Sequence, residues 1–289
     1  MKTLIEILKD ADSRGVAVGH FNISELAALK GIFAGARTLN VPVIIGVSEG
    51  EREFIGVRQV VALIKSIREE YDYPIFLNAD HTHSLEKVKE AAEAGFDEIL
   101  FDGSSLSFDE NIAQTKEVVR VVRSINPDIV IEGEIGYIGT SSEIIEKRPE
   151  NLALSTPEEA IQFIQSTGID VLAPAVGNMH GLLKTMIAGK EQKRLDIERI
   201  KAIKAVCGKY MTLHGGSGTA REDFVAAMKA GMTIIHVSSE LRLAWRSGVE
   251  LGLKNNPNEI APYKILPPAI EAIQKIVEDR LELFNGIVE

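Results

Sequence analysis

The sequence contains almost no cysteine: Cys207 is the only one among 289 residues. A single thiol cannot form an internal disulfide, which excludes a disulfide-stapled secreted domain and is typical of a reducing compartment. Its surroundings, IKAIKAVCG, have the apolar spacing of a helix. We therefore interpret Cys207 as a buried helical thiol rather than a nucleophile.

Long hydrophobic runs are also missing. The most apolar stretches, such as VPVIIGV at 41–47, are far shorter than the roughly 20 residues that cross a bilayer. The N-terminus carries Leu4, Ile5 and Leu8 at helical spacing with acids between them, which predicts a short amphipathic helix and not a signal peptide. We expect a cytoplasmic protein that does not associate with a membrane.

An excess of basic residues is absent as well. Lysine and arginine number 32 against 42 aspartates and glutamates, for a net charge of −10. Nothing therefore indicates a basic surface for nucleic acid or for an anionic membrane. Hydrophobic residues make up 45% and charged residues 26%, an ordinary balance for a globular protein. The acidic total is compatible with a phosphorylated substrate, because backbone amides and one cation suffice to bind a phosphate.

Short β-rich runs alternate with longer helical patterns along the whole chain. Several helical segments begin at a Ser, Thr or Asp and several end at Gly. Eight such units without a linker predict one (β/α)8 barrel domain over residues 1–289, with an extra C-terminal helix in an extension of about 257–289. A doubly wound open sheet is the alternative, but it needs a glycine fingerprint after the first strand, where this chain has HFNIS. The expected strands are Val16–Asn22, Val43–Ser48, Ile75–His81, Glu98–Asp102, Ile129–Ile135, Val171–Ala175, Met211–His214 and Ile234–Ser238.

Two connections are longer than the others, at residues 136–156 after the fifth expected strand and 176–195 after the sixth. Loops that follow barrel strands lie on the catalytic face of this fold. We interpret both segments as candidate lids.

Every histidine lies in, at, or just past the C-terminal part of an expected strand, which places all of them at one rim of the barrel. Three imidazoles from different strands with one open position are the usual construction of a catalytic zinc site, where the metal acts as a Lewis acid. Glu132 and Glu134 lie on one face of their strand and would repel each other unless a cation or a proton lies nearby. The histidines are His20, His81, His83, His180, His214 and His236, and the other acids at the rim are Asp80 and Asp102.

A glycine-rich segment, HGGSG at 214–218, follows the seventh expected strand, and VSSELR at 237–242 follows the eighth. The loops after strands seven and eight of a barrel often hold a phosphate through backbone N–H groups and a helix N-terminus. Ser217 and Ser239 would add hydroxyl groups. The residues alone therefore predict a metal-assisted reaction on a phosphorylated small molecule.

At this point the order of motifs resembles a known family. The segments are FN at 21–22, VSEG at 47–50, DH at 80–81, FDGS at 101–104, EGEIG at 132–136, GNMHG at 177–181, HGGSG at 214–218 and SSELR at 238–242. Together they are similar to the class II, metal-dependent ketose-bisphosphate aldolases of the fructose- and tagatose-bisphosphate group, over roughly residues 3 to 246.

The resemblance implies a set of site residues. His81, His180 and His214 would hold one catalytic zinc ion per subunit, and Glu134 would be an alternative ligand that lets the metal shift. Asp80 would exchange a proton with the C4 hydroxyl of the substrate. The resemblance also implies a homodimer or homotetramer, and a monovalent cation, Na⁺ or K⁺, near the carbonyl groups of Gly181 and Gly215. Residues implied to contact substrate or phosphate are Asn22, Ser48, Gly181, Lys184, Gly215, Ser217, His236, Ser238 and Ser239, although Lys184 is equally well explained as a solvated lysine.

Three departures from the family pattern bear on the substrate. His236 stands where an Asn that contacts substrate is usual, and Ser238 replaces a nearby acid or Asn. The glutamate of the mobile loop, which removes a proton at C3, is displaced. In GTSSEIIE the counted place falls on Ser142, so Glu143 is the candidate base with Glu146 behind it, unless both are solvated acids.

Two further points concern His83 and the distal phosphate. Because the chain is already turning after His81, we expect His83 to support the metal site or to make a loop hydrogen bond. Arg52, Arg242 and Arg246 are the candidates for binding the far phosphate.

The expected reaction is cleavage of fructose 1,6-bisphosphate to dihydroxyacetone phosphate and glyceraldehyde 3-phosphate. Tagatose bisphosphate or another ketose derived from dihydroxyacetone phosphate is an alternative substrate. A Schiff-base aldolase needs a lysine inside the barrel, and the expected strands contain none. A metal-dependent hydrolase, suggested by the spacing of His81 and His83, and a sugar-phosphate-binding barrel without turnover are the remaining alternatives.

Overall fold

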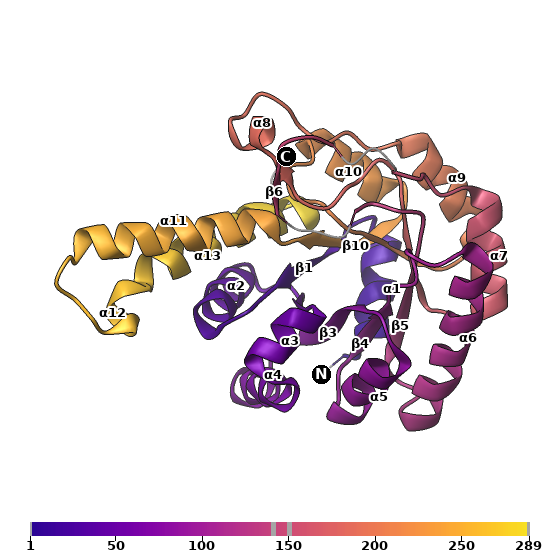
Figure 1. Ribbon diagram of the computed structural model, residues 1–289, viewed down its shortest axis with the longest axis horizontal. Helices are drawn as coiled ribbons and strands as arrows, with labels where there is room; N and C mark the ends of the chain where they lie inside the picture. Colours follow the sequence, from indigo (N-terminus) through magenta and orange to yellow (C-terminus); the bar gives the residue numbers. More distant parts are fainter. Residues whose placement is uncertain (1, 140–142, 149–151, 288–289) are drawn as a thin grey trace.

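The structure, a computed structural model, describes residues 2–139, 143–148 and 152–287. Eight parallel strands close into a barrel with helices on its outside (Figure 1). The predicted barrel is thereby confirmed, and each of its eight strands begins and ends within two residues of the expected range. In their order around the barrel the strands are β1 (Val18–Asn22), β10 (Met232–Val237), β9 (Tyr210–Leu213), β7 (Val171–Pro174), β5 (Val130–Ile135), β4 (Glu98–Phe101), β3 (Ile75–Thr82) and β2 (Val43–Val47).

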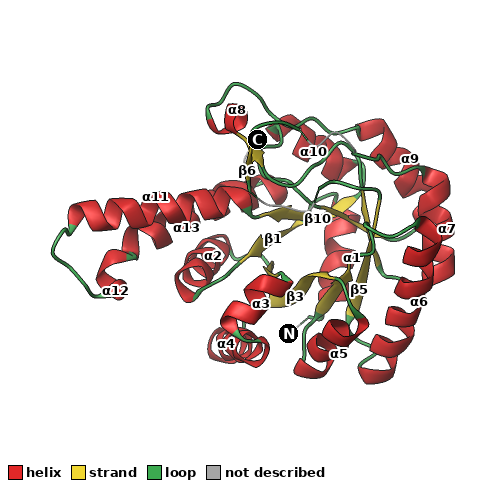
Figure 2. Cartoon of the chain, in the orientation of Figure 1, coloured by secondary structure: helices red, strands yellow, loops and turns green. Residues whose placement is uncertain are grey.

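The helices are drawn red in Figure 2, and local capping explains where many of them begin. Ser107 forms a capping box with Glu110, and Thr156 forms one with Glu159, so the first free N–H groups of both helices are satisfied. The helices are α1 (Leu4–Arg14), α2 (Leu26–Leu39), α3 (Glu49–Ile55), α4 (Val57–Tyr71), α5 (Leu85–Ala94), α6 (Phe108–Ile125), α7 (Pro157–Thr167), α8 (Lys184–Ile187), α9 (Ile197–Cys207), α10 (Arg221–Lys229), α11 (Ser239–Asn255), α12 (Pro262–Ile265) and α13 (Pro267–Phe284). Cys207 is buried at the end of α9, as predicted.

Helix α1 closes the N-terminal end of the barrel. Its apolar face, with Leu4, Ile7 and Leu8, packs against the first inward-pointing layer of strand residues, and all of these side chains are buried. That layer consists of Val18, Ile44, Phe76, Val130, Val171 and Ile234. This end of the barrel is therefore a dry core, and the access to the barrel interior lies at the other end.

The C-terminal extension contains more structure than the one expected helix. Helix α13 packs against α2 and α11, and the long α11, together with α12 and α13, projects beyond the barrel in Figure 1. The projecting part leaves apolar side chains exposed, namely Leu251, Leu253, Ile260 and Tyr263. Among the described residues, no helix combines the length and the apolar character needed to cross a bilayer.

The two long connections predicted as lids lie against each other. Strand β6 (Ile144–Ile145) belongs to the first and pairs in parallel with β8 (Leu182–Leu183) of the second. An ion pair between Arg148 and Glu191 joins the same two segments. The described parts of both connections therefore form one layer over the C-terminal end of the barrel.

Candidate active site

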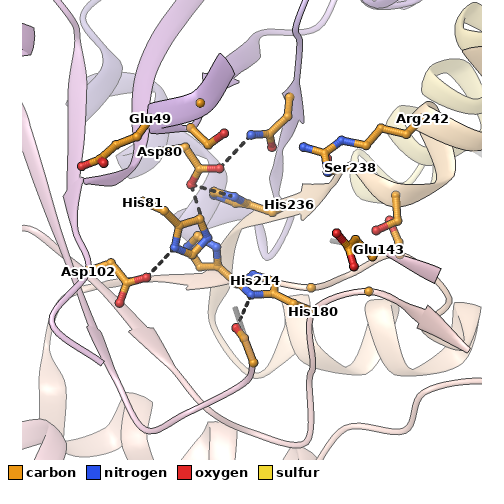
Figure 3. Close-up of a pocket in the computed structure, with 18 of the residues that line it drawn as sticks. Glu49, Asp80, His81, Asp102, Glu143, His180, His214, His236, Ser238 and Arg242 are labelled. Atoms are coloured by element: carbon orange, nitrogen blue, oxygen red, sulfur yellow. Dashed lines mark hydrogen bonds and ion pairs between the residues drawn. The ribbon is translucent and has the colours of Figure 1, made fainter. Parts of the chain in front are cut away.

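A cleft of about 420 Å³ opens at the C-terminal ends of the strands (Figure 3). The sequence-predicted residues in its lining are Asn22, Ser48, Asp80, His81, His83, Asp102, Glu143, His180, Gly181, His214, Gly215, Ser217, His236, Ser238, Ser239 and Arg242. Of the predicted site residues, Glu134 lies beneath this surface beside His81, and Lys184 lies outside it. The fold thus brings together nearly the whole set that the sequence predicted.

The end of β3 turns two adjacent residues into the cleft. Consecutive strand residues normally point to opposite faces, but His81 has a left-handed backbone with φ of 39°, and the register between β3 and β4 shifts between Ala79 and Thr82. Such bulges change the direction of a side chain and are common beside active sites. Asp80 and His81 can therefore both reach the same space.

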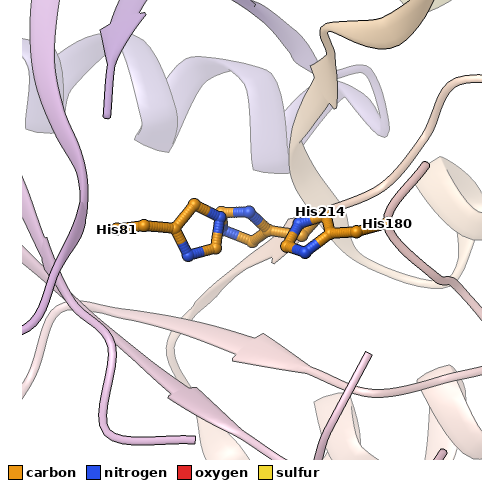
Figure 4. A group of neighbouring side chains, drawn as sticks. All are labelled: His81, His180 and His214. Atoms are coloured by element: carbon orange, nitrogen blue, oxygen red, sulfur yellow. The ribbon is translucent and has the colours of Figure 1, made fainter. Parts of the chain in front are cut away.

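Three imidazoles converge near the centre of the cleft (Figure 4). The ring of His81 lies 4.9 Å from the rings of both His180 and His214, centroid to centroid. The three residues can each offer a nitrogen such that all three nitrogens lie within 4.8 Å of one another. This arrangement matches the three protein ligands of a tetrahedral metal site with an open fourth position.

The other nitrogen of each ring lies beside an oxygen atom. Nδ1 of His81 is 2.7 Å from Oδ2 of Asp102, Nδ1 of His180 is 2.6 Å from the Gly139 carbonyl oxygen, and Nε2 of His214 is 2.8 Å from Oε1 of Glu132. A hydrogen bond of this kind fixes the ring and directs the remaining lone pair at a ligand. The donor set therefore fits a divalent metal ion.

The charges around the triad support the same conclusion. Burial, together with the neighbouring His81, lowers the pKa of His180 and of His214 to about 3, so both rings are neutral, as ligands must be. Burial opposes charge on His81 too, but the carboxylates of Asp80 and Asp102 outweigh it and raise the pKa of His81 to about 10. A bound cation would take the place of this proton among the acids.

Glu134 lies close enough to His81 to be considered as a metal ligand. Its Oε2 is 3.8 Å from Nδ1 of His81 and has no hydrogen-bond partner within the described chain. Burial, reinforced by the charge of Asp102, raises the pKa of Glu134. Because His81, Asp102 and Glu134 can also bring three ligand atoms together, the geometry suits the alternative-ligand role expected for Glu134.

Asp80 lines the cleft, and one of its carboxylate oxygens has no partner among the described residues. Its Oδ2 accepts a hydrogen bond of 2.8 Å from Nδ2 of Asn22, whereas Oδ1 has no hydrogen-bond partner among the described residues. Oδ1 lies 3.8 Å from Nε2 of His81 and 3.8 Å from Nδ1 of His236. Burial alone would raise the pKa of Asp80, but the positive charge of His81 and His20 lowers it. The residue is thus held as a carboxylate.

His236 forms a stack with His20 on the neighbouring strand. The two rings are 3.4 Å apart and tilted by only 7°, and both are buried. Space for the His20 ring exists because residue 46 on β2 is glycine: a Cβ atom there would lie 2.0 Å from Cε1 of His20. Parallel rings cannot both direct their in-plane lone pairs at one ion, so we interpret the pair as a packed support for the cleft floor.

The glycine-rich side of the cleft contains an unexpected lysine. Gly181 and Gly215 both have positive φ, and a Cβ on Gly215 would lie 2.3 Å from the carbonyl oxygen of Met179. Beside them, the fully buried Lys193 lines the cleft. Lys184, the predicted candidate, is exposed and pairs with Glu146 instead.

The two candidate bases of the lid, Glu143 and Glu146, lie in different environments. Glu143 lines the cleft, whereas Glu146 turns to Lys184 on the exposed side. Ser142, where the family glutamate was counted, lies outside the described residues. His83 makes a loop contact, as expected, with Nδ1 3.2 Å from the carbonyl oxygen of Asp102.

The three arginines considered for a distal phosphate differ in burial and in their partners. Arg52 is buried and donates to the carbonyl oxygens of Val47 and Asp80, so it supports the strand ends. Arg246 is largely exposed and pairs with Glu250. Arg242 lines the cleft, is half exposed, and pairs with Glu51, with Nη2 2.7 Å from Oε1.

The sequence did not predict that Lys193 is buried and lines the cleft. It lies in the charged run KEQKR of the second lid segment, which has the composition of a solvated loop. The residues that follow it, RLD at 194–196, do not indicate an inward-pointing lysine either. Only the folded loop shows that this one lysine of the run points inward.

Comparisons with known proteins place the chain. A sequence model of the family described as "Fructose-bisphosphate aldolase class-II" matches residues 2–287. The chain is 32% identical over 283 residues to the fructose-bisphosphate aldolase of Staphylococcus aureus strain Mu50, covering 97% of this chain and 96% of the relative. It is 31% identical over 306 residues to the fructose-bisphosphate aldolase of Thermus caldophilus, covering 99% and 98%.

A solved structure agrees with these relatives. The YdjI aldolase from Escherichia coli K12 superimposes with a TM-score of 0.83 at 25% identity, and the match covers 100% of both chains. The three-histidine centre, the aspartate beside it and the glycine-rich loops thus occur in a chain whose whole length matches these aldolases. The chain belongs to the class II fructose-bisphosphate aldolase family.

Proposed function

We propose that the protein is a zinc-dependent aldolase that cleaves fructose 1,6-bisphosphate between C3 and C4 and catalyses the reverse condensation. The observation that carries the proposal is the unpartnered Oδ1 of Asp80, 3.8 Å from Nε2 of His81, in a triad of imidazoles whose other nitrogens are already fixed. When bound by His81, His180 and His214, the zinc ion would supply a Lewis acid that polarises the C2 ketone of the substrate.

Asp80 and Glu143 would move the protons. In cleavage, the Asp80 carboxylate takes the proton of the C4 hydroxyl as the C3–C4 bond breaks and C4 becomes the aldehyde carbon. Glu143, in its protonated form, then gives a proton to C3 of the three-carbon ketone half. Asn22 holds Asp80 in position through its 2.8 Å hydrogen bond, so the aspartate needs little reorganisation.

The two phosphates would bind at opposite sides of the cleft. The segments around Gly181, Gly215 and Ser217 and the start of α11 at Ser239 offer backbone amides and hydroxyls to the phosphate on C1. Arg242, together with Ser48, is the candidate for the phosphate on C6. Arg242 lines the cleft, and its side chain is half exposed, so an anion in the cleft can reach the guanidinium group. A monovalent cation is not part of the proposal, since the Gly215 carbonyl oxygen already accepts a hydrogen bond from Lys193.

A second substrate is favoured by one specific observation, the imidazole of His236 on the cleft floor. The resemblance implies an asparagine there, and an imidazole stacked on His20 is larger and less able to rotate. Tagatose 1,6-bisphosphate or another ketose phosphate would be preferred if this ring selects among hydroxyl orientations. Comparing kcat/KM for fructose 1,6-bisphosphate, tagatose 1,6-bisphosphate and fructose 1-phosphate decides between them.

The proposed proton transfers are tested with purified zinc-loaded protein. Asp80→Asn should lower kcat for cleavage by about 10²–10⁴-fold while zinc remains bound. Glu143→Gln should slow exchange of the C3 proton of dihydroxyacetone phosphate with solvent, whereas the matched Glu146→Gln should not. Full activity of Asp80→Asn, or equal effects of the two glutamate variants, would contradict these roles.

We also propose a homodimer or homotetramer. The support is the cluster of exposed apolar side chains on the projecting α11–α13 segment, since such clusters mark protein–protein contacts. Light scattering gives the mass directly, and Ile260→Asp should shift it toward the monomer if this segment forms the contact. The cytoplasmic location expected from the sequence stays a prediction.

A further inference from the structure

Lys193 is a lysine whose entire side chain lies inside the protein. Its ammonium group donates to two carbonyl oxygens, 2.7 Å away on Met179 and 2.9 Å away on Gly215. The backbone around it is fixed as well, because its N–H donates to the carbonyl oxygen of Gly218 and its own carbonyl accepts from Ala220. The ammonium group is thus a built feature of the cleft wall and not a loosely placed surface charge.

The ammonium group has no carboxylate partner in the described part of the chain. No described acid lies within ion-pair distance of it, in contrast to the exposed Lys184, which pairs with Glu146. Glu240 is the acid whose charge most favours the protonated lysine, but its two oxygens are taken by the N–H of Gly218 and by Arg280. Burial lowers the pKa of Lys193 to about 7. A buried cation without a counter-ion is costly, and it is stabilised once an anion enters the same cleft.

The neighbours of Lys193 indicate what kind of anion that is. Gly181, Gly215 and Ser217 line the same part of the cleft, and the 17-residue helix α11 begins there at Ser239. Backbone amides and a helix N-terminus favour a phosphate. The carbonyl oxygens of Met179 and Gly215, however, would repel one. An ammonium group that bridges these two oxygens neutralises them and turns this wall of the cleft positive.

We propose that Lys193 is a built-in cation of the phosphate site, whose ammonium group uses its remaining N–H to bind the C1 phosphate of the substrate in place of a free monovalent cation. The expected ion would use the carbonyl oxygens of Gly181 and Gly215, and the ammonium group already donates to the second of these. The inference rests on the proposed function for the identity of the phosphorylated ligand. It adds that binding of this phosphate is independent of Na⁺ and K⁺ in this chain.

The first test needs no variant. Cleavage of fructose 1,6-bisphosphate and binding of inorganic phosphate are measured for the zinc-loaded protein in tetramethylammonium chloride, which is then replaced stepwise by NaCl or KCl at constant ionic strength. The expected result is a change of less than about two-fold in KM and in the phosphate dissociation constant. A rise in activity or phosphate affinity of ten-fold or more with either ion would overturn the proposal.

The second test removes the charge and keeps the shape. Lys193→Met should weaken phosphate binding, followed by calorimetry, by at least ten-fold, and Na⁺ or K⁺ should then restore part of it. The matched control is Lys190→Met, an exposed lysine of the same loop, which should bind phosphate as the parent protein does. Unchanged phosphate affinity in a folded, zinc-loaded Lys193→Met protein would overturn the proposal.

The two readouts separate this inference from the proposed function. Loss of phosphate binding in Lys193→Met, in a protein that cleaves no ketose bisphosphate, would leave the phosphate site standing and remove the proposed reaction. Normal cleavage with unchanged phosphate affinity in Lys193→Met would leave the proposed reaction standing and remove the proposed role of Lys193. If Lys193→Met does not fold, the cation series on the parent protein still decides the question.

Discussion

The two ends of the barrel interior differ sharply although the same strands build both. The end closed by α1 is packed with apolar side chains, among them Phe76, which is buried against the helix. The opposite end contains histidines, acids and Asn78, all buried. A barrel interior is normally filled by branched apolar residues, so the second layer is the exception.

The buried polar groups at this end lower the free energy of unfolding, because several of them lack hydrogen-bond partners. Both ring nitrogens of His20, both amide atoms of Asn78 and both carboxyl oxygens of Glu98 have no hydrogen-bond partner among the described residues. Burial, together with the charge of Glu132, raises the pKa of Glu98, so this carboxyl group is kept neutral. The comparison teaches that apolar packing under α1, and between the strands and the outer helices, allows the other end of the barrel interior to keep groups suited to chemistry.

The largest expected effect is at the polar end, where His81→Ala removes a metal ligand. Loss of a residue that merely supports a ligand costs roughly 10–100-fold in metal affinity or activity, and loss of the ligand itself should exceed this. Zinc content by mass spectrometry and kcat for cleavage should both fall. The matched variant His83→Ala removes an exposed imidazole two residues on and should retain its zinc; equal zinc loss in both would contradict the assignment.

The next effect concerns the α1 end and stability alone. Phe76→Ala leaves a cavity under α1 and should lower the free energy of unfolding by about 3–5 kcal/mol. The cleavage rate of the folded protein should remain within about two-fold of the parent. Denaturant titration measures the first quantity, and Phe54→Ala, at a phenylalanine that is 77% exposed, is the control with an effect near zero. A large loss of kcat in folded Phe76→Ala would mean that the two ends are not separate.

A smaller effect tests the packing between β1 and β2. Gly46→Ala forces a methyl group into the ring of His20 and should destabilise the protein by about 1–3 kcal/mol. His20→Ala in the same chain makes room for the methyl group, so the double variant should be more stable than the sum of the two single changes predicts. Strict additivity in denaturant titrations would show that the two residues do not compete for this space.

The smallest effect is a pH dependence due to His20. Burial lowers its pKa from the ordinary 6.5 to about 4. Between these values the unfolded chain binds a proton that the folded protein refuses, so the stability from neutral His20 is complete above pH 6.5 and is lost as the pH falls toward 4. His20→Asn should remove ~1–2 kcal/mol of the acid destabilisation between pH 6.5 and 4.5, measured by denaturant titration of zinc-loaded protein. An unchanged pH profile in His20→Asn would contradict the assignment.

Much of the fold could be predicted because its signals are local. Each strand is a short apolar run, and helices such as α6 and α7 begin at capping boxes visible in the sequence. The length of α11 and its projection with α13 could not be predicted, because they depend on contacts of α13 with α2 and α11 that a pattern does not contain.

The candidate site, too, could be predicted from the sequence only in part. The triad of His81, His180 and His214 follows from strand ends and from the resemblance, because parallel strands bring their carboxyl ends together. The inward direction of Lys193 depends instead on its backbone contact with Gly218, a contact made only in the folded loop. Likewise, the stack of His20 on His236 exists only because β1 and β10 close the barrel in register.

The most direct test of the central claim is cleavage of fructose 1,6-bisphosphate by the purified protein before and after treatment with EDTA, followed by the return of zinc. The account predicts that cleavage disappears on chelation and recovers with zinc, because the three imidazoles at the polar end hold the ion that activates the ketone. Cleavage that persists in metal-free protein, or its absence in protein shown to contain zinc, would contradict it.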